Sequence, residues 1–507
     1  MVQHPQVNTM GKETNSFDYR TFASYLLPKN ILKFFDVTGI KEEHTNTVDQ
    51  TGTEIVILHI SLDELDNREQ LGLDLKPNGF TESREVTDFP IRDHKVVLHV
   101  RRRRWLDADG HNVVFNNYEL AAAGTGYSKE FADVLKKYMD TFPITASSLA
   151  RYFKVDAGNL SRSYKQYLSG FTKWDQTDHA DKWLLLEQNM GTDLSIDETQ
   201  IGNDVRTILT NKDGHGRKGS LIAIVKGTDS DEVVKVLLQL PEDKRNAVKE
   251  VTMDFSDSMY SIVQAAFPNA TIVIDCFHIF QRCIEAIEEL RLKLKRKETA
   301  KRRREEAAYK RKQHQRAKRR AKYRATHPKN YKGEKRGRKP MRLNARFVPE
   351  RLSNGDTMLD LLTRGKRLLA QSGDKWGTTQ KARAALLFKH FPELQKAYGL
   401  VQSLRSIFGT DKDKRGKKDN KPELSREEAS VKLDAWCQKV TECTLREVKS
   451  ARDCILEKRD EVLNYFIKGS TNASAESINA KMKGFRSEIH GIQDLPFFLF
   501  RCTKIFG

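Results

Sequence analysis

The chain has 507 residues and a mass of 58.3 kDa, which is too long for one hydrophobic core and predicts about two to four domains. No segment reaches the roughly 20 uninterrupted apolar residues of a membrane span, and residues 1–20 lack the apolar core of a signal peptide. These features exclude an integral membrane protein and predict a cytoplasmic one. The six cysteines all follow residue 275 and form no CxxC pair, so neither a zinc knuckle nor a disulfide framework is predicted.

The net charge of +20 comes from one segment. Residues 291–340 contain 24 Lys and Arg against 4 Asp and Glu, so the rest of the chain is neutral. A block of like charge repels itself in isolation and is typical of segments that bind phosphate backbones. Nucleic acid is therefore the expected partner, with Arg302, Arg303 and Arg304 as candidate contacts.

The N-terminal quarter predicts a polar, disordered tail (1–16) and a small α+β module (17–125). Residues 19–27 and 29–35 have the pattern of short helices, and 53–62 and 94–105 that of strands. The stretch 84–95 between the strands has the proline and polar residues of a turn. The second strand ends in Arg101, Arg102, Arg103 and Arg104, followed by an aromatic residue. This cluster suits contact with a nucleic-acid backbone, and a merely solvated strand edge explains it equally well.

Residues 126–175 contain two short amphipathic segments, 145–153 and 159–168, joined by about five residues. This spacing predicts a helix-turn-helix whose second helix enters a DNA major groove, with an ordinary helical hairpin as the alternative. Lys154 stands where the turn often has a glycine. The polar face of the second helix, which is the predicted DNA-binding surface, consists of Asn159, Ser161, Arg162 and Lys165.

From residue 190 the pattern becomes that of an α/β domain. Three strand-like runs (193–201, 205–211 and 220–228) begin the order β-β-β-α-β-α-β, which is that of a ribonuclease-H-like fold with a mixed sheet. Residues 281–468 are almost wholly helical, apart from basic loops at 326–344 and 409–423. The predicted core is therefore split into 190–280 and 469–507 by a helical insertion that carries the basic run 291–345.

Three carboxylates occupy related positions in this core. Alternation along 193–198 separates Asp197 from the apolar side chains, Asp254 ends a later strand, and Glu476 lies in the first turn of the last predicted core helix. Asn479 and Lys483 share the face of Glu476, and Asp257 is a reserve candidate. Taken singly, each acid is explained as well by helix capping or the helix dipole.

Three acids on these elements would meet in one place, because the first and fourth strands of such a fold are neighbours. They cannot all stay ionised without a cation, and oxygen ligands select Mg²⁺ or Mn²⁺. Two such ions can support phosphoryl transfer on DNA.

Asp275 and His278 follow a buried strand directly. They can meet if the strand stops near residue 276 and a helix begins, as the helical spacing of the apolar residues after it indicates. Asp275 would then cap the helix or orient His278 at the edge of the site. A hydrogen-bonded pair without catalytic duty is the alternative.

Four motifs resemble the DDE transposases of bacterial insertion sequences, specifically the ISL-three type. They are "IDE" (196–198), "VTMDFSDSMY" (251–260), "FPNATIVIDCFHIFQR" (267–282) and "SAESINAKMKGF" (474–485). The resemblance covers about 190–290 and 470–507, and the N-terminal module resembles that of a related, Bacteroidetes-like branch. It implies that Asp197, Asp254 and Glu476 bind metal, and that Asp275 and His278 form an accessory motif. Many relatives begin with a cysteine-rich zinc segment, which this chain lacks.

The predicted function is that of a bacterial transposase that cuts double-stranded DNA at the ends of its element and joins them to a target. Two Mg²⁺ or Mn²⁺ ions per site and a homo-oligomer on DNA are expected, with the protein associated with the nucleoid. Neither a membrane nor a small-molecule substrate is expected. A non-catalytic DNA-binding protein on the same scaffold is one alternative, and a structure-selective ribonuclease-H-like nuclease is the other.

Overall fold

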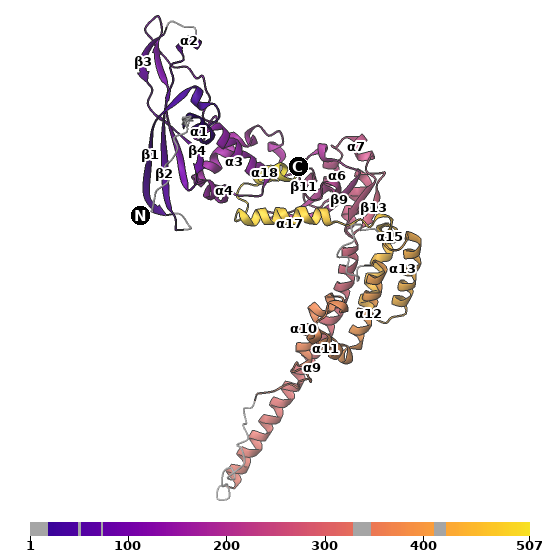
Figure 1. Cartoon of the computed structure of the whole chain (residues 1–507). Helices are drawn as coiled ribbons and strands as arrows, with labels where there is room; N and C mark the ends of the chain where they lie inside the picture. The colour runs from indigo at the N-terminus through magenta and orange to yellow at the C-terminus, as the bar shows by residue number, and fades with distance from the viewer. Residues whose placement is uncertain (1–18, 49–51, 72–74, 328–345, 410–421) are drawn as a thin grey trace, which may run out of the picture.

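The computed structural model describes residues 19–48, 52–71, 75–327, 346–409 and 422–507. The predicted tail and most of the two basic loops lie outside the described residues. The chain is a mixed α/β protein in which a β-rich module, a group of short helices, an α/β core and a helical insertion follow one another (Figure 1). Within the described ranges, no helix is both long and apolar enough to cross a bilayer.

The N-terminal module contains one mixed sheet and one smaller antiparallel sheet, with short flanking helices. Its larger sheet has the order β1-β2-β5-β4, and the smaller one the order β3-β6-β7. The strands are β1 (Phe35–Val48), β2 (Glu54–Glu64), β3 (Lys76–Phe80), β4 (Arg84–Ile91), β5 (His94–Arg101), β6 (Arg103–Leu106) and β7 (Asn112–Val113), and the helices α1 (Tyr19–Leu26) and α2 (Arg68–Leu71).

Two local predictions in this module were wrong. The stretch 84–95 is mostly strand β4 rather than a turn, because Pro90 falls on an edge strand at a register shift between Asp88 and Ile91, where a proline removes no ladder hydrogen bond. The segment 29–35 forms only a 3₁₀ turn (Ile31–Lys33) before the chain enters β1.

The segment predicted as a helix-turn-helix contains two short helices joined by a turn, α4 (Ala146–Phe153) and α5 (Ala157–Ser163), and α5 continues as a π-helical turn (Tyr164–Leu168). These helices pack on α3 (Lys129–Thr141) through buried Leu149, Leu160 and Tyr164. Lys154 ends α4 with a φ of 53°, so it adopts the left-handed conformation that a glycine usually provides at such a turn.

The core sheet has the order β13-β12-β9-β10-β11-β8. Strands β9, β10 and β11 form an antiparallel meander, while β12 pairs in parallel with β9 and with β13. This topology confirms the ribonuclease-H-like prediction, and β8 is an additional edge strand. The strands are β8 (Trp183–Leu185), β9 (Asp193–Ile201), β10 (Asp204–Asn211), β11 (Leu221–Lys226), β12 (Glu250–Met253) and β13 (Thr271–Ile274).

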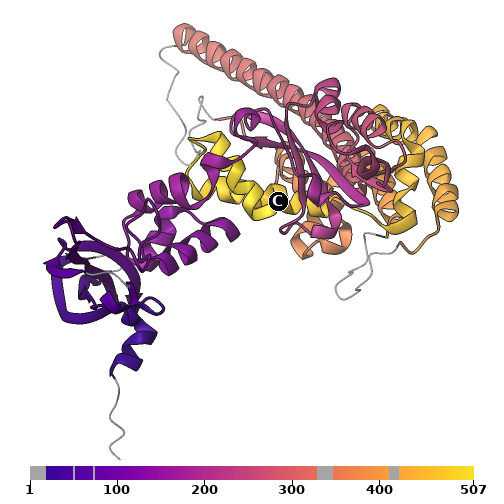
Figure 2. The same ribbon diagram turned by 90° about the horizontal axis from the view of Figure 1, so that it is seen from above.

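Helices cover both faces of this sheet. Leu194 and Leu209 face one hydrophobic core, shared with α6 (Ser230–Leu237) and α8 (Asp257–Ala266); the short α7 (Glu242–Asn246) lies between them in sequence. Ile208 and Ile224 face a second core, shared with α17 (Ala473–Glu488) and α18 (Leu495–Phe506). The end of the chain therefore completes the core domain after the insertion, as Figure 2 shows.

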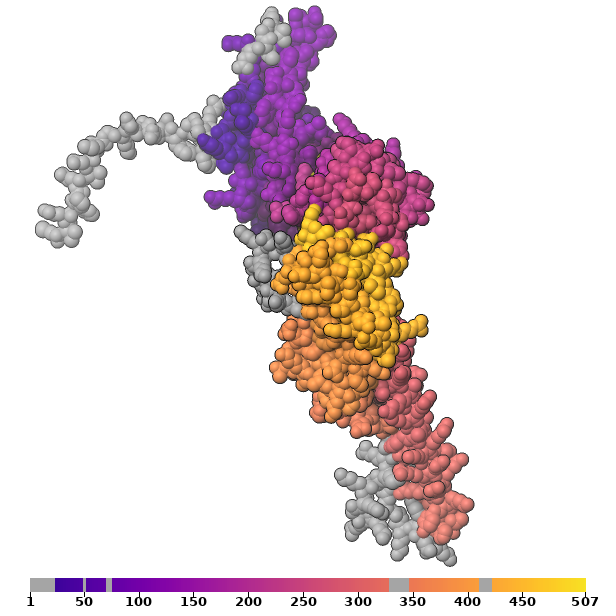
Figure 3. All heavy atoms as spheres, turned by 90° about the vertical axis from the view of Figure 1, so that its right-hand side faces the viewer, coloured from indigo at the N-terminus to yellow at the C-terminus, as the bar shows by residue number. Residues whose placement is uncertain are grey.

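The insertion begins with α9 (Cys276–Thr326), a helix of 51 residues whose buried side chains end at Leu294. The remainder of α9 is basic and projects beyond the other helices (Figures 1 and 3). The helices that pack around its first half and return the chain are α10 (Met358–Ala370), α11 (Thr378–His390), α12 (Pro392–Ile407), α13 (Arg426–Thr441), α14 (Arg446–Glu457), α15 (Arg459–Leu463) and α16 (Tyr465–Lys468).

Candidate active site

Asp197 lies on the face of β9 that is turned toward α17. Leu194 and Ile196 are buried on the opposite face, as strand alternation requires. The Nδ2 of Asn479, on α17, donates to Oδ2 of Asp197 at 2.7 Å, and the backbone N–H of Glu198 donates to its other oxygen at 2.8 Å. The core helix therefore holds this carboxylate in one orientation.

Asp254 directly follows β12, the parallel neighbour of β9. The backbone N–H of Ser256 donates to its carboxylate at 2.8 Å, which fixes the turn into α8. The reserve candidate Asp257 lies in the first turn of α8 and is ion-paired with Lys458 of the insertion. Asp257 thus has a structural partner.

Asp275 ends β13 and caps α9. One of its oxygens accepts the N–H of Phe277 at 3.1 Å, and the other accepts the N–H of Asn472, before α17, at 3.2 Å. With 2% exposure, this acid is almost completely buried. It therefore joins the end of the strand, the start of the long helix and the start of α17.

Glu476 projects from the first turn of α17 toward this junction. Potential ligand atoms of Asp275, His278 and Glu476 all lie within 4.8 Å of one another. Asp197 and Asp254 do not belong to so tight a group within the described part of the chain. The acids of the site are therefore arranged as a compact trio with two further carboxylates beside it.

The charges of these groups act on one another. Burial raises the pKa of Asp197; the Glu198 N–H and His278 lower it, and the carboxylates of Asp254 and Glu476 raise it. Burial likewise raises the pKa of Glu198, with contributions from Asp254 and Asp197. Carboxylates that repel one another at close range favour a bound cation.

The donor set fits a hard divalent cation. It consists of carboxylate oxygens and one imidazole, and the buried amide oxygen Oδ1 of Asn479 has no hydrogen-bond partner. Oxygen-rich sites suit Mg²⁺ or Mn²⁺, whereas structural zinc usually takes thiolates and imidazoles. The residues present can therefore hold such an ion.

The predicted DNA-binding arginines of the N-terminal module have partners inside that module, except for Arg104, which is exposed. Arg101 forms a two-point ion pair with Asp63, at 2.8 and 2.6 Å. Arg102 donates to the carbonyl oxygen of Tyr118 at 2.6 Å and Arg103 to that of Glu64 at 2.7 Å. Three of the four side chains thus hold the module together.

The other predicted DNA-binding residues lie on several elements. Asn159, Ser161 and Arg162 are exposed on α5, whereas Lys165 pairs with Asp494, the residue before α18, at 2.5 Å. A further group is exposed on helices of the core and insertion: Arg302, Arg303 and Arg304 on the projecting part of α9, and Lys483 on α17.

Asn472 was missed by sequence reasoning. Its Oδ1 accepts from Ser195 Oγ at 2.9 Å, and its N–H binds Asp275, so it links β9 to the end of β13. The partners are 277 and 197 residues away in the sequence. No local pattern carries that information.

The topology of the core sheet, with acids on β9, directly after β12 and on α17, places this protein in the class with a ribonuclease-H-like fold. The sequence model of a transposase family, DDE of the ISL-three type, matches residues 194–348 and 345–502, which is more than half of the chain. The chain belongs to this family of transposases. The match includes the helical insertion and is thus wider than the predicted resemblance; residues 1–193 lie outside it. No curated protein matches the chain significantly.

Proposed function

We propose that this transposase cuts the DNA ends of its insertion sequence and joins them to a target, in a metal-dependent reaction. The observation that carries the proposal is that three acids from different elements lie near enough for the charges of two of them, Asp254 and Glu476, to raise the pKa of the third, Asp197. Asp197 lies on β9, Asp254 directly after β12 and Glu476 on α17. The accessory pair Asp275 and His278 lies against Glu476.

Asp197, Asp254 and Glu476 would hold two Mg²⁺ or Mn²⁺ ions. When bound, such ions activate an attacking hydroxyl and stabilise the leaving oxygen in phosphoryl transfer. The chain's own part is to orient the ligands: Asn479 fixes Asp197, and Asp275 fixes the start of α17 through Asn472. His278 places an imidazole ring beside Glu476.

Double-stranded DNA is the proposed partner. The exposed faces of α5 and of the projecting part of α9 offer cations and amides to phosphates and bases, which suits recognition of element ends and a non-specific grip, respectively. Because two ends must be joined in one event, we propose a homo-oligomer on DNA, acting on the bacterial nucleoid in the cytoplasm.

The test compares wild type with Glu476→Gln on a plasmid that carries the DNA flanking the gene, with Mg²⁺ or Mn²⁺. We expect nicks at the element boundaries, reduced at least about 100-fold by the substitution, since a ligand is removed. The control variant Asp257→Asn should cut DNA normally, because Asp257 is ion-paired with Lys458 of the insertion.

Each alternative gives a different result. Binding without cutting in either metal would indicate a non-catalytic scaffold. Cuts at DNA junctions irrespective of the end sequence would indicate a structure-selective nuclease. Cuts that persist in Glu476→Gln would show that another acid, first of all Asp275, takes its place.

A further inference from the structure

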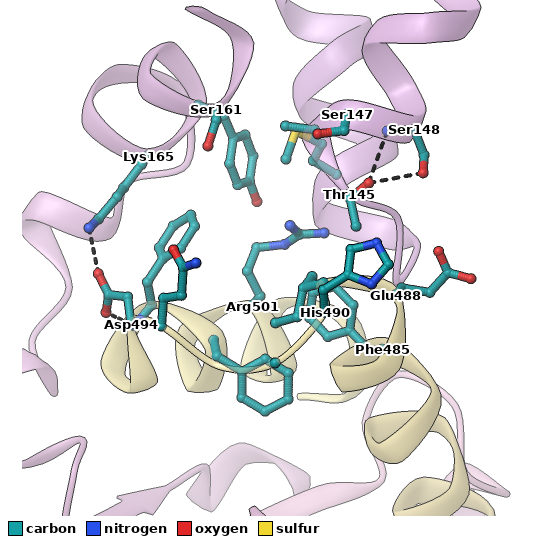
Figure 4. Close-up of a pocket in the computed structure, with 18 of the residues that line it drawn as sticks. Thr145, Ser147, Ser148, Ser161, Lys165, Phe485, Glu488, His490, Asp494 and Arg501 are labelled. Carbon is teal, nitrogen blue, oxygen red and sulfur yellow. Dashed lines mark hydrogen bonds and ion pairs between the residues drawn. The ribbon is translucent and has the colours of Figure 1, made fainter. Parts of the chain in front are cut away.

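A cavity of about 730 Å³ lies where the helix-turn-helix meets the C-terminal helices (Figure 4). One wall consists of α3, the N-terminal end of α4 and the π-helical turn. The other consists of the end of α17, the loop after it and α18. The cavity is thus a joint between the segment outside the family match and the catalytic core.

Arg501, on α18, is a buried cation in this cavity, and its guanidinium points into the middle of it (Figure 4). The residue is 4% exposed, and Nη2 donates to the carbonyl oxygens of Phe142 and Ile144 at 3.1 and 3.2 Å. Its Nε has no partner, and no carboxylate in the described ranges lies within ion-pair distance. Burial lowers the pKa of this guanidinium. The guanidinium lies over the rings of Tyr164 and Phe485, at 5.2 and 5.0 Å, but among the described residues it has no carboxylate counter-ion, and a buried charge without one is costly.

The rest of the lining favours an anion over a cation. The N-terminal end of α4 opens into the cavity. The Thr145 hydroxyl oxygen accepts the N–H of Ser148 at 2.9 Å, while the N–H groups of Ala146 and Ser147, which precede it, have no acceptor within the helix. Hydroxyls of Ser147 and Ser161 stand nearby. Of the acids, Asp494 is already paired with Lys165, and Glu488 is exposed.

We propose that this cavity binds a phosphate of the DNA backbone, with Arg501 as its counter-ion. The proposal rests on the proposed function, since it assumes that DNA runs from the helix-turn-helix to the acids. Helix α17 connects the two places: Glu476 and Glu488 are 12 residues apart. This corresponds to about 18 Å along the helix axis at 1.5 Å per residue. The same distance along a DNA duplex, at about 3.4 Å per base pair, corresponds to about five base pairs. The bound phosphate should therefore lie about five base pairs from the cleaved one.

The test is ethylation interference on full-length protein in the Glu476→Gln background without metal, so that binding is measured apart from cleavage. The probe is an element-end duplex ethylated at random phosphates. We expect one or two ethylated phosphates, about five base pairs from the cut, to weaken binding about 10-fold. With Arg501→Met, binding should fall similarly and ethylation at those phosphates should no longer matter.

A second variant covers the possibility that Arg501→Met fails to fold. Ser147→Asp places a negative charge at the start of α4, where it favours the helix but repels a phosphate. It should lose the same interference bands, whereas the uncharged Ser147→Asn should keep them. An unchanged pattern in the folded variants would overturn the inference and leave the proposed function intact.

Two other outcomes also count against the phosphate site. If inorganic phosphate raises the melting temperature of wild type through Arg501 while the interference pattern does not depend on it, the cavity takes a free anion. If wild type binds no element-end DNA at all, the proposed function fails, and this inference fails with it.

Discussion

At the scale of single residues, Asp197 is the most constrained group of the site. Its carboxylate is partly buried, accepts from Asn479 and the Glu198 N–H, and is repelled by the charges of Asp254 and Glu476. Ionising it in the absence of metal therefore costs stability, which a bound cation would recover.

We predict that Asp197→Asn stabilises the metal-free protein by about 1 kcal/mol at pH 7, because the repulsion and desolvation of a charge are removed. The unpartnered Oδ1 of Asn479 can accept from the new amide. Since burial raises the pKa of Asp197 in the folded state, wild type binds more protons when folded than unfolded. Wild-type stability should therefore fall as the pH rises through that raised pKa, and the difference between the two proteins should shrink at acidic pH.

The measurement is urea unfolding in EDTA over a range of pH. Asp231→Asn is the matched control, because this exposed acid favours the N-terminus of α6 and its removal should destabilise by a few tenths of a kcal/mol. A less stable Asp197→Asn at all pH values would contradict this account.

At the scale of elements, the junction of β13 with α9 depends on Asp275. This residue caps α9 and also satisfies a buried N–H at the start of α17. One side chain thus fixes two helices that are separated by the whole insertion.

We predict that Asp275→Ala lowers the free energy of unfolding by about 2–3 kcal/mol, because a cap is removed and a buried donor is left without a partner. Asp275→Asn retains a capping oxygen and should cost less, about 1 kcal/mol. Asp229→Ala removes an exposed cap from α6 and should also cost about 1 kcal/mol. Equal losses for Asp275→Ala and Asp229→Ala in urea unfolding would show that the bond to Asn472 contributes nothing.

The elements of the core could be predicted because their signals are local. The apolar runs of β9 to β13, and the change to helical spacing after Asp275, indicate both the strand order and the stop of the last strand. The edge strand β4 could not be predicted, since Pro90 resembles a turn residue until the edge position is known. The three-residue strand β8 was missed because it is too short to show a pattern.

The candidate acids could be predicted individually, but their arrangement could not. Alternation identified the face of Asp197 correctly. The close trio with His278 and the pairing of Lys165 with Asp494 join residues about 200 or more positions apart. The four arginines at 101–104 also looked alike in sequence, while three of them bond inside their own module.

At the scale of the whole molecule, positive charge lies on one projection. The part of α9 beyond Leu294 has no buried side chains and extends away from the core (Figure 3). Its exposed arginines Arg302, Arg303 and Arg304 can meet phosphates without disturbing any packing.

Replacing Arg302, Arg303 and Arg304 with Gln should weaken binding to element-end and unrelated DNA equally. The slope of log affinity against log salt should shrink by about 0.9 for each phosphate that the protein no longer neutralises, so by up to about 2.7. The melting temperature should not change, because these side chains are exposed. The measurement is a salt titration of DNA affinity.

The matched control replaces three exposed lysines with Gln, Lys396 of α12 and Lys432 and Lys439 of α13, and should leave the slope unaltered. If the control reduces the salt slope as much as the arginine replacement does, DNA affinity depends on the total charge of the protein and not on the projecting part of α9. If only element-end binding falls, the projection reads sequence.

The position of the insertion also governs when the site can exist during synthesis. Asp275 and Glu476 are 201 residues apart, and their meeting requires α17 to reach the sheet. At about 5–20 residues per second, a ribosome needs roughly 10–40 s to add that length. During this interval the nascent chain carries α4, α5 and its first acids without a complete cluster. If the helices bind DNA as proposed, a growing or prematurely ended chain would occupy DNA without assembling the cluster, and incomplete products would compete with the finished protein for the element ends.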